Sequence, residues 1–161
     1  MSEHNPVSNP AHYTVYPVPP ISITRHLGYC LGSAVRCVLS APHRGTPIED
    51  LNKALRFLKW EIEPLNFAGA EKYGYPFKPC YGAYRQVVDA IAEMDRFMSL
   101  PEHGRTYLYP AMFLEALQVY LHGIWREKSD TAHSKALLAF GDMHGAIEKM
   151  IREEELFPCE K

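Results

Sequence analysis

The hydrophobic positions between residues 47 and 63 recur at alternating steps of three and four residues. This spacing puts apolar side chains on one face of a helix, so the pattern predicts an amphipathic helix over 47–63. Thr46 is a suitable N-cap, with Pro47 at the first helical position and Glu49 completing a capping box. The apolar stripe of this helix consists of Ile48, Leu51, Leu55, Leu58 and Ile62.

A similar stripe precedes it and predicts a helix over 22–41, paired antiparallel with the helix over 47–63. Pro42 and Gly45 bracket the turn between the two helices. Gly28 and Gly32 remove side-chain bulk from one face, which lets another backbone or a ligand approach closely. We expect these side chains to be buried between or beneath the two helices: Leu31, Val38, Leu51, Leu55 and Leu58.

Further apolar periodicity predicts three more helices, over about 81–100, 110–125 and 130–155. No stretch shows the alternation of a strand. The sequence therefore predicts an all-α fold, with a single compact domain of about five helices over 21–157. In this domain a helical hairpin over 21–63 is followed by additional helices over 81–155.

Residues 1–20 contain five prolines, which predict an extended arm in place of a helix. The arm also carries Tyr13, Val15, Tyr16 and Val18. We expect it to lie on its own domain or on a neighbouring subunit. Burying it against a neighbour would remove apolar surface from water, so we expect a homo-oligomer.

Composition limits the classes of partner. The 161 residues are 47% hydrophobic and 22% charged, with a formal net charge of −2, as in a soluble globular protein. This balance argues against nucleic acid as a partner, since duplex binding usually needs a basic face. No apolar run approaches the ~20 residues of a membrane span, the N-terminus has no signal-peptide core, and the cysteines form no CxxC pair. We expect a cytoplasmic protein that does not contact a membrane.

Polar and charged side chains gather at the end of the predicted hairpin. They are Ser33, Arg36, Ser40, His43, Arg44, Asp50 and Lys53. Arginine and lysine suit phosphate, because they supply charge-assisted hydrogen bonds to its oxygens. A solvated turn with ordinary surface charge is the alternative interpretation. The sequence contains no Walker A loop, no Rossmann glycine pattern and no Gly-x-Ser-x-Gly turn.

Three segments carry a resemblance to a known family. The opening, residues 9–13, matches Asn-Pro-x-His-Tyr. Residues 32–45 align with Gly-Asn-x-Ile-Lys-Tyr-Ile-x-Arg-x-x-x-Lys-Gly, and residues 49–58 align with Glu-Asp-Leu-x-Lys-Ala-x-x-Tyr-Leu. Over residues 9–63 the chain resembles a bacteriophage family, long described as a domain of unknown function, that includes the T7-type nucleotide kinase, which lacks a P-loop.

The resemblance implies transfer of a phosphoryl group from a nucleoside triphosphate to a deoxynucleoside monophosphate, with Mg²⁺, in the cytoplasm of a phage host. It implies that Arg36, Asp50 and Lys53 are catalytic, and that Asp50 also holds the metal. The side chains implied to bind nucleotide or phosphate are Asn9, His12, Tyr13, Ser33, Arg36, Ser40, His43 and Arg44.

The sequence also departs from the family pattern. Ser33 stands where the family has Asn, Arg36 replaces a Lys, and Cys37 and Phe57 each replace a Tyr. Ser40 stands where the family has an Arg, which removes a cation. That loss favours a second hypothesis, a non-catalytic protein that sequesters or senses nucleotides.

Two further hypotheses come from other parts of the chain. Residues 121–125 and the helix after them faintly resemble an all-α nucleotide pyrophosphohydrolase, although the carboxylate pattern Glu-Glu-x-x-Glu of that class is missing. The last alternative is a purely structural protein that exchanges its proline-rich arm between subunits.

Overall fold

The computed structural model describes residues 14–62, 81–103, 106–125 and 130–157. These ranges contain helices and turns but no strand, which confirms the all-α prediction. None of the described helices is long and apolar enough to cross a membrane. The helices are α1 (Ile21–Thr24), α2 (Tyr29–Ser40), η2 (Ala41–His43), α3 (Pro47–Ile62), α5 (Tyr81–Met98), η4 (Pro101–His103), α6 (Leu108–Trp125) and α7 (Asp130–Leu156).

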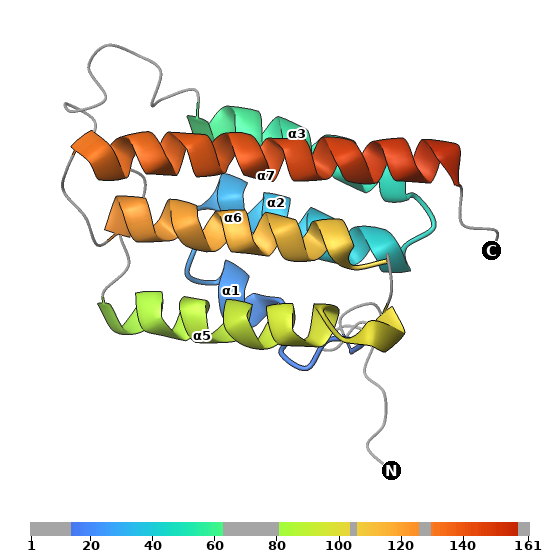
Figure 1. The fold of residues 1–161 in the computed structure, drawn as a ribbon, viewed down its shortest axis with the longest axis horizontal. Helices are drawn as coiled ribbons and strands as arrows, with labels where there is room; N and C mark the ends of the chain where they lie inside the picture. Colours follow the sequence, from blue (N-terminus) through green and yellow to red (C-terminus); the bar gives the residue numbers. More distant parts are fainter. Residues whose placement is uncertain (1–13, 63–80, 104–105, 126–129, 158–161) are drawn as a thin grey trace.

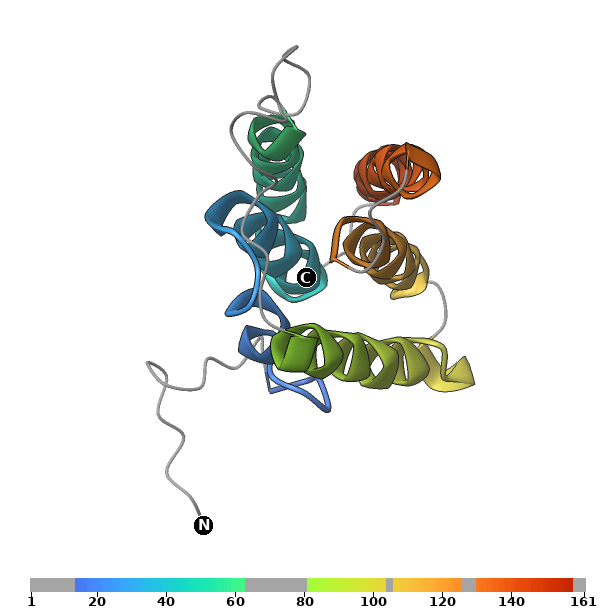
Figure 2. The same cartoon turned by 90° about the vertical axis from the view of Figure 1, so that its left-hand side faces the viewer.

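Two antiparallel helix pairs form the body of the molecule, α2 with α3 and α6 with α7 (Figure 1). The pairs meet where α3 packs against α7. Figure 2 looks along both pairs and shows α5 crossing beneath them, where it contacts α6 and α1. The core lies between these layers, and its largest fully buried side chains include Leu39, Leu51, Leu58, Met94, Phe113, Tyr120 and Met143.

The predicted helical hairpin is present. Leu31, Val38, Leu51 and Leu58 are buried, and Leu55 is partly buried against the core. The stripe of α3 is less complete at its start, because Ile48 is exposed.

The prediction of one continuous helix over 22–41 is wrong. The chain forms the short α1, turns through residues 25–28 and begins α2 at Tyr29. Gly28 is the N-cap of α2 and has an extended backbone, which interrupts the helical path. The carbonyl oxygen of Thr24 lies 3.1 Å from where a side chain at Gly32 would begin, so the end of α1 packs directly on α2. The close approach expected at Gly32 is therefore real, and α1 is the backbone that makes it.

The N-terminus of α2 has no cap from its own N-cap residue, since Gly28 has no side chain. Glu61, in the last turn of α3, accepts a hydrogen bond from the backbone of Leu31 there. A carboxylate suits this place because a helix N-terminus carries partial positive charge. Burial nevertheless raises the pKa of Glu61, and the hydrogen bond from Leu31 opposes that shift.

The described end of the arm packs on its own domain. Tyr16 is buried, and its hydroxyl donates a 2.6 Å hydrogen bond to the carbonyl oxygen of Leu39 in α2. Its ring makes edge contacts with the rings of His43, Phe97 and Tyr107. This aromatic cluster joins the arm to the turn after α2, the end of α5 and the start of α6. Residues 1–13 of the arm and residues 63–80 lie outside the described residues.

Candidate functional site

The turn between α2 and α3 places a carboxylate inside the protein and cations outside it. Asp50 lies in the first turn of α3 and is 2% exposed. Its Oδ2 accepts a hydrogen bond from Nη1 of Arg44 at 3.3 Å, and its Oδ1 accepts one from Nζ of Lys53 at 3.4 Å. The side chains of Arg44 and Lys53 are about half exposed, at 51% and 50%. The buried carboxylate thus holds two cations at the surface of the turn.

Lys53 has a second partner, since its Nζ lies 2.7 Å from Oε1 of Glu49. This exposed pair is one helical turn apart. The hydrogen bond that Lys53 donates to Glu49, together with the charge of Lys53, lowers the pKa of Glu49, and the same hydrogen bond raises the pKa of Lys53. Lys53 therefore stays protonated at neutral pH.

The pKa of the Cys37 thiol depends on the charges around it. Burial raises its pKa, and the negative charge of Asp50 raises it further. The positive charges of Arg36, Lys53 and Arg44 act in the opposite direction. All four charged groups predicted at the site are therefore close enough to Cys37 to affect it. Arg44 and Lys53 also contact Asp50, whereas Arg36 is exposed on the outer side of α2.

Other predicted site residues are not at a solvent-facing phosphate site. Ser33 and Ser40 are buried, although the sequence analysis grouped them with the polar side chains at the end of the hairpin. The hydroxyl of Ser40 donates a 3.2 Å hydrogen bond to the carbonyl oxygen of Cys37 in its own helix. A serine can be buried in this way because its helix backbone satisfies the hydroxyl.

His43 lies in surroundings that the sequence analysis did not predict. Its Nε2 lies 3.1 Å from the hydroxyl of Tyr107, and its ring packs against those of Tyr16 and Tyr107. The imidazole belongs to the aromatic cluster. Asn9, His12 and Tyr13 lie outside the described residues.

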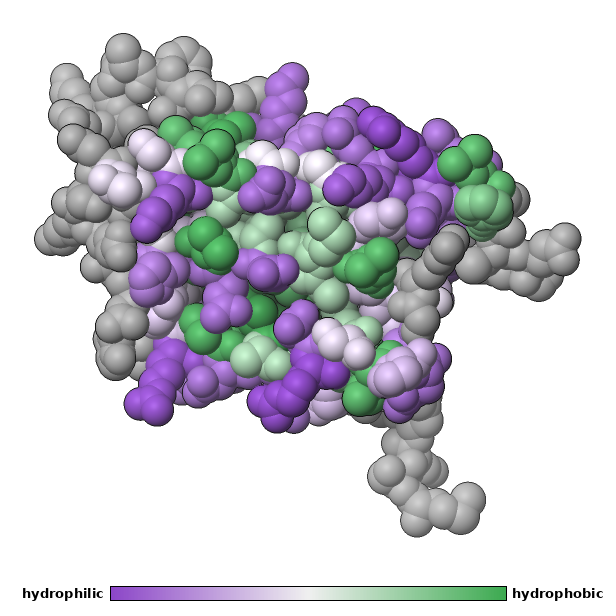
Figure 3. Space-filling view, in the orientation of Figure 1, coloured by the Kyte–Doolittle hydropathy of each residue, from purple (hydrophilic) through white to green (hydrophobic). Residues whose placement is uncertain are grey.

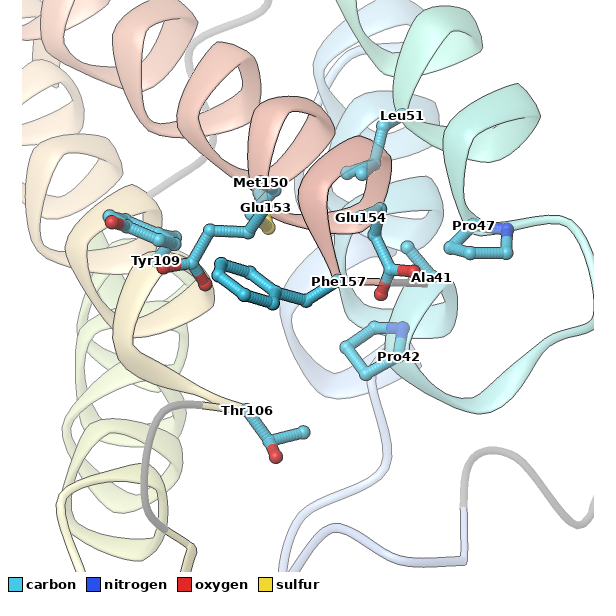
Figure 4. Close-up of a pocket in the computed structure, with 10 residues that line it drawn as sticks. All are labelled: Ala41, Pro42, Pro47, Leu51, Thr106, Tyr109, Met150, Glu153, Glu154 and Phe157. Carbon is cyan, nitrogen blue, oxygen red and sulfur yellow. The ribbon is translucent and has the colours of Figure 1, made fainter. Parts of the chain in front are cut away.

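A pocket of about 250 Å³ lies beside the turn. One wall comes from the turn, where Pro42 and Pro47 flank the segment that carries Arg44. The other comes from the end of α7 and the start of α6, and Figure 4 shows Glu153 and Glu154 extending into it from α7. The remaining lining residues are Ala41, Leu51, Thr106, Tyr109, Met150 and Phe157.

This pocket combines apolar walls with carboxylates. In the view of Figure 4 the ring of Phe157 lies between the carboxylates of Glu153 and Glu154. Carboxylates accept hydrogen bonds from amino groups, and aromatic rings stack on flat ligands. The sequence analysis missed these residues, because the Glu run at the end of the last helix resembled an ordinary solvated terminus. Their proximity to the turn comes from long-range packing of α7, for which no local signal exists.

The described residues offer a poor site for a protein-bound metal. They contain no group of three or more His, Cys, Asp or Glu side chains placed to hold one ion. Both oxygens of Asp50, the residue implied to bind Mg²⁺, already interact with protein cations. A magnesium ion held by Asp50 would have to displace Arg44 or Lys53, so the residues present do not fit that role.

Comparison with known proteins gives one match. The model of a family described as a protein of unknown function, DUF3310, matches residues 7–59, which is less than half of the chain. Among curated proteins and solved structures, none matches the chain significantly. The matched residues include the whole turn and Asp50, while the α6 and α7 wall of the pocket lies beyond them.

Proposed function

We propose that this protein binds nucleotides at the turn between α2 and α3. The observation that carries the proposal is the buried Asp50, which holds Arg44 and Lys53 in fixed positions at the surface. The side chains of both cations are about half exposed, so a ligand at the surface of the turn can reach them. Two preorganised cations suit a phosphate group, and in this proposal the exposed Arg36 of α2 is the third cation that binds it.

In this proposal the adjacent pocket takes the base. Its apolar lining and the ring of Tyr109 would stack on a flat heterocycle, and Glu153 or Glu154 would accept hydrogen bonds from base N–H groups. The separation of charge supports this orientation. Carboxylates at the end of α7 repel phosphates, which leaves the phosphates to the basic side of the turn.

The reaction that the family resemblance implies is phosphoryl transfer from a nucleoside triphosphate to a deoxynucleoside monophosphate, in the cytoplasm of a phage host. Such transfer depends mainly on positioning and on cations around the phosphates. Because the described residues lack a metal site, Mg²⁺ in this proposal is bound by oxygens of the triphosphate itself.

A non-catalytic nucleotide-binding protein is the second candidate. One observation favours it: both oxygens of Asp50 are engaged by Arg44 and Lys53, so this carboxylate is poorly placed to accept a proton from a phosphate acceptor. An all-α pyrophosphohydrolase would need a dense carboxylate cluster, and the described residues contain none.

Thermal-shift measurements with nucleoside mono-, di- and triphosphates, each with and without Mg²⁺, test the proposal. A ligand that binds the native state raises the melting temperature. Product analysis of each ligand found then separates the kinase, which forms diphosphates, from the binder, which leaves nucleotides unchanged. Absence of a shift with every nucleotide would contradict nucleotide binding.

The site is tested with Arg36→Ala, and Lys59→Ala is the matched control because Lys59 is an exposed cation at the far end of α3. Arg36→Ala should weaken nucleotide binding by about 1.5–3 kcal/mol, the range of a charge-assisted hydrogen bond. Its melting temperature without ligand should stay unchanged, because Arg36 is exposed. A lower melting temperature with normal affinity would show instead that Arg36 is a structural residue.

A further inference from the structure

The outward face of α6 is unusually apolar. Leu108, Met112 and Val119 lie on it and are between 38% and 49% exposed. Glu115 is the charged residue among them. A helix at a protein surface normally turns polar residues outward, and a helix that is apolar nearly all round is normally buried. The described chain therefore leaves a face of α6 uncovered that has the composition of an interface.

The same surface continues onto α7. The two helices form a shallow groove of about 480 Å³, and Leu138 at its edge is 71% exposed. At Gly141 and Gly145 an added Cβ would meet nothing within 4 Å. The groove thus has room for the backbone of another helix. Figure 3 views this face and shows apolar residues along the centre with hydrophilic residues on either side.

Charges on this face alternate in sign. Lys135, Asp142 and Lys149 follow one another along α7 at steps of seven residues, which is about two helical turns. None of the three forms an ion pair with another residue in the part of the chain that the structure describes. A partner that complements this face must present apolar surface and charges of both signs in the matching order.

A second copy of this chain meets that requirement. If α7 of one copy runs antiparallel to α7 of the other, a two-fold axis beside Gly145 sets Asp142 of each copy opposite Lys149 of the other. The closest approach of the backbones then falls at Gly145, where no side chain is in the way. Such an arrangement is self-complementary, as the symmetric interface of a homodimer must be.

We propose that the α6–α7 face is the interface of a two-fold homodimer. The dimer buries Leu138 and the outer face of α6, and it pairs Asp142 of each copy with Lys149 of the other across the axis. This face lies outside residues 7–59, so the interface belongs to the part of the chain that the family model does not match. The described arm residue Tyr16 takes no part, because it is buried in its own domain.

Sedimentation velocity of the full chain, over a concentration series in the micromolar range, tests the interface with Gly145→Leu. The wild type should sediment as a dimer. Added bulk at the helix crossing should raise the dimer dissociation constant about 100-fold or more. The variant should keep its helical circular dichroism, because the position is open in the protomer and leucine favours helix over glycine. Asn52→Leu, at an exposed position of α3 outside the proposed interface, is the control and should leave the dimer intact.

A charge exchange tests the register. Asp142→Lys and Lys149→Asp should each weaken the dimer about tenfold, and the double exchange should restore it, because opposite charges again face each other. A wild type that stays monomeric throughout the series would overturn the proposal. A dimer that survives both Gly145→Leu and Asp142→Lys would overturn it too, and would assign the contact to another surface.

Discussion

The α2–α3 hairpin and the α6–α7 pair break the rule of apolar interior and polar surface in opposite directions. The hairpin buries a carboxylate, Asp50, and two hydroxyl residues, Ser33 and Ser40. It compensates Asp50 and Ser40 from within the chain. The α6–α7 pair exposes Leu138 and much of the outer face of α6, and nothing among the described residues covers them.

The difference separates two kinds of exception. A buried charge with its own partners is stable in the isolated chain, and it is then able to position those partners for a ligand. An exposed apolar face has no contacts within the chain that remove it from water, so it indicates a binding partner. The first exception therefore points to a small-molecule site, and the second to a protein interface.

The most severe way to break the hairpin is to add a charge that it cannot compensate. Ser40→Arg restores the residue type of the resembled family, but Ser40 is 2% exposed at the end of α2. We expect a loss of about 2–4 kcal/mol in the free energy of unfolding, because a guanidinium at this place loses water without gaining an anion. Urea denaturation measures the loss. Ser40→Ala, the control, should cost less than half as much, and equal losses in the two variants would contradict this view of the site.

Removing the buried charge is the next test. Asp50→Asn keeps the shape of the side chain but removes the anion that binds Arg44 and Lys53. We expect a loss of about 1.5–3 kcal/mol by urea denaturation, the range for charged hydrogen bonds, since the two cations are half exposed and recover hydration. Glu49→Gln, at the exposed carboxylate beside it, should leave unfolding unchanged. If Asp50→Asn instead stabilised the protein, the free-energy cost of burying the carboxylate would exceed the stabilisation that Arg44 and Lys53 provide.

Tyr120 tests the α6–α7 pair, where a polar group is buried without a partner among the described residues. Its hydroxyl is buried at α6 and has no hydrogen-bond partner among the described residues. Burial, and the nearby charge of Glu61, raise the pKa of this phenol. Tyr120→Phe should therefore raise the free energy of unfolding by about 0.5–1 kcal/mol, since an unpaired buried hydroxyl costs more than a ring hydrogen. A loss of stability in thermal or urea unfolding would instead reveal a partner for the hydroxyl.

Glu61 gives the smallest effect, and it depends on pH. Because burial raises its folded-state pKa above 4.5, the folded protein binds this proton more tightly than the unfolded chain does. Glu61 therefore does not reduce the free energy of unfolding below pH 4.5. As pH rises through the folded-state pKa, ionisation of the buried carboxyl reduces this free energy. Glu61→Gln keeps an acceptor for the backbone of Leu31. It should match the wild type in acid and exceed it slightly at pH 7, as melting curves across this range will show. A variant that is less stable than the wild type at pH 7 would contradict the assignment.

Local periodicity was sufficient to predict the hairpin, because Leu51 and Leu58 report directly on which side of α3 faces inward. It was insufficient for α2. That helix is buried on nearly every side, so its polar residues Ser33 and Ser40 did not mark a surface. The break before Tyr29 was missed for a related reason: the signal was one glycine, and its effect depends on how α1 packs against Gly32.

One part of the candidate site could likewise be predicted from the sequence, and another part could not. The closeness of Arg44, Asp50 and Lys53 follows from a short turn and one helical turn, so the sequence was enough to predict it. The pocket was not predictable, because Tyr109 and Glu153 reach the turn only after α6 and α7 have packed. The aromatic surroundings of His43 were not predictable either, because its neighbour Tyr107 lies 64 residues away in the sequence.

The aromatic cluster has a consequence for the synthesis of the protein on the ribosome. Tyr107 packs against both Tyr16 and His43, so the cluster cannot close until the growing chain has passed residue 107. The segment that the family model matches is complete long before that, at residue 59. During translation α2 and α3 therefore emerge before the rings of Phe97 and Tyr107 can cover Tyr16 and His43. The matched segment gains these contacts only after the second half of the chain has been made.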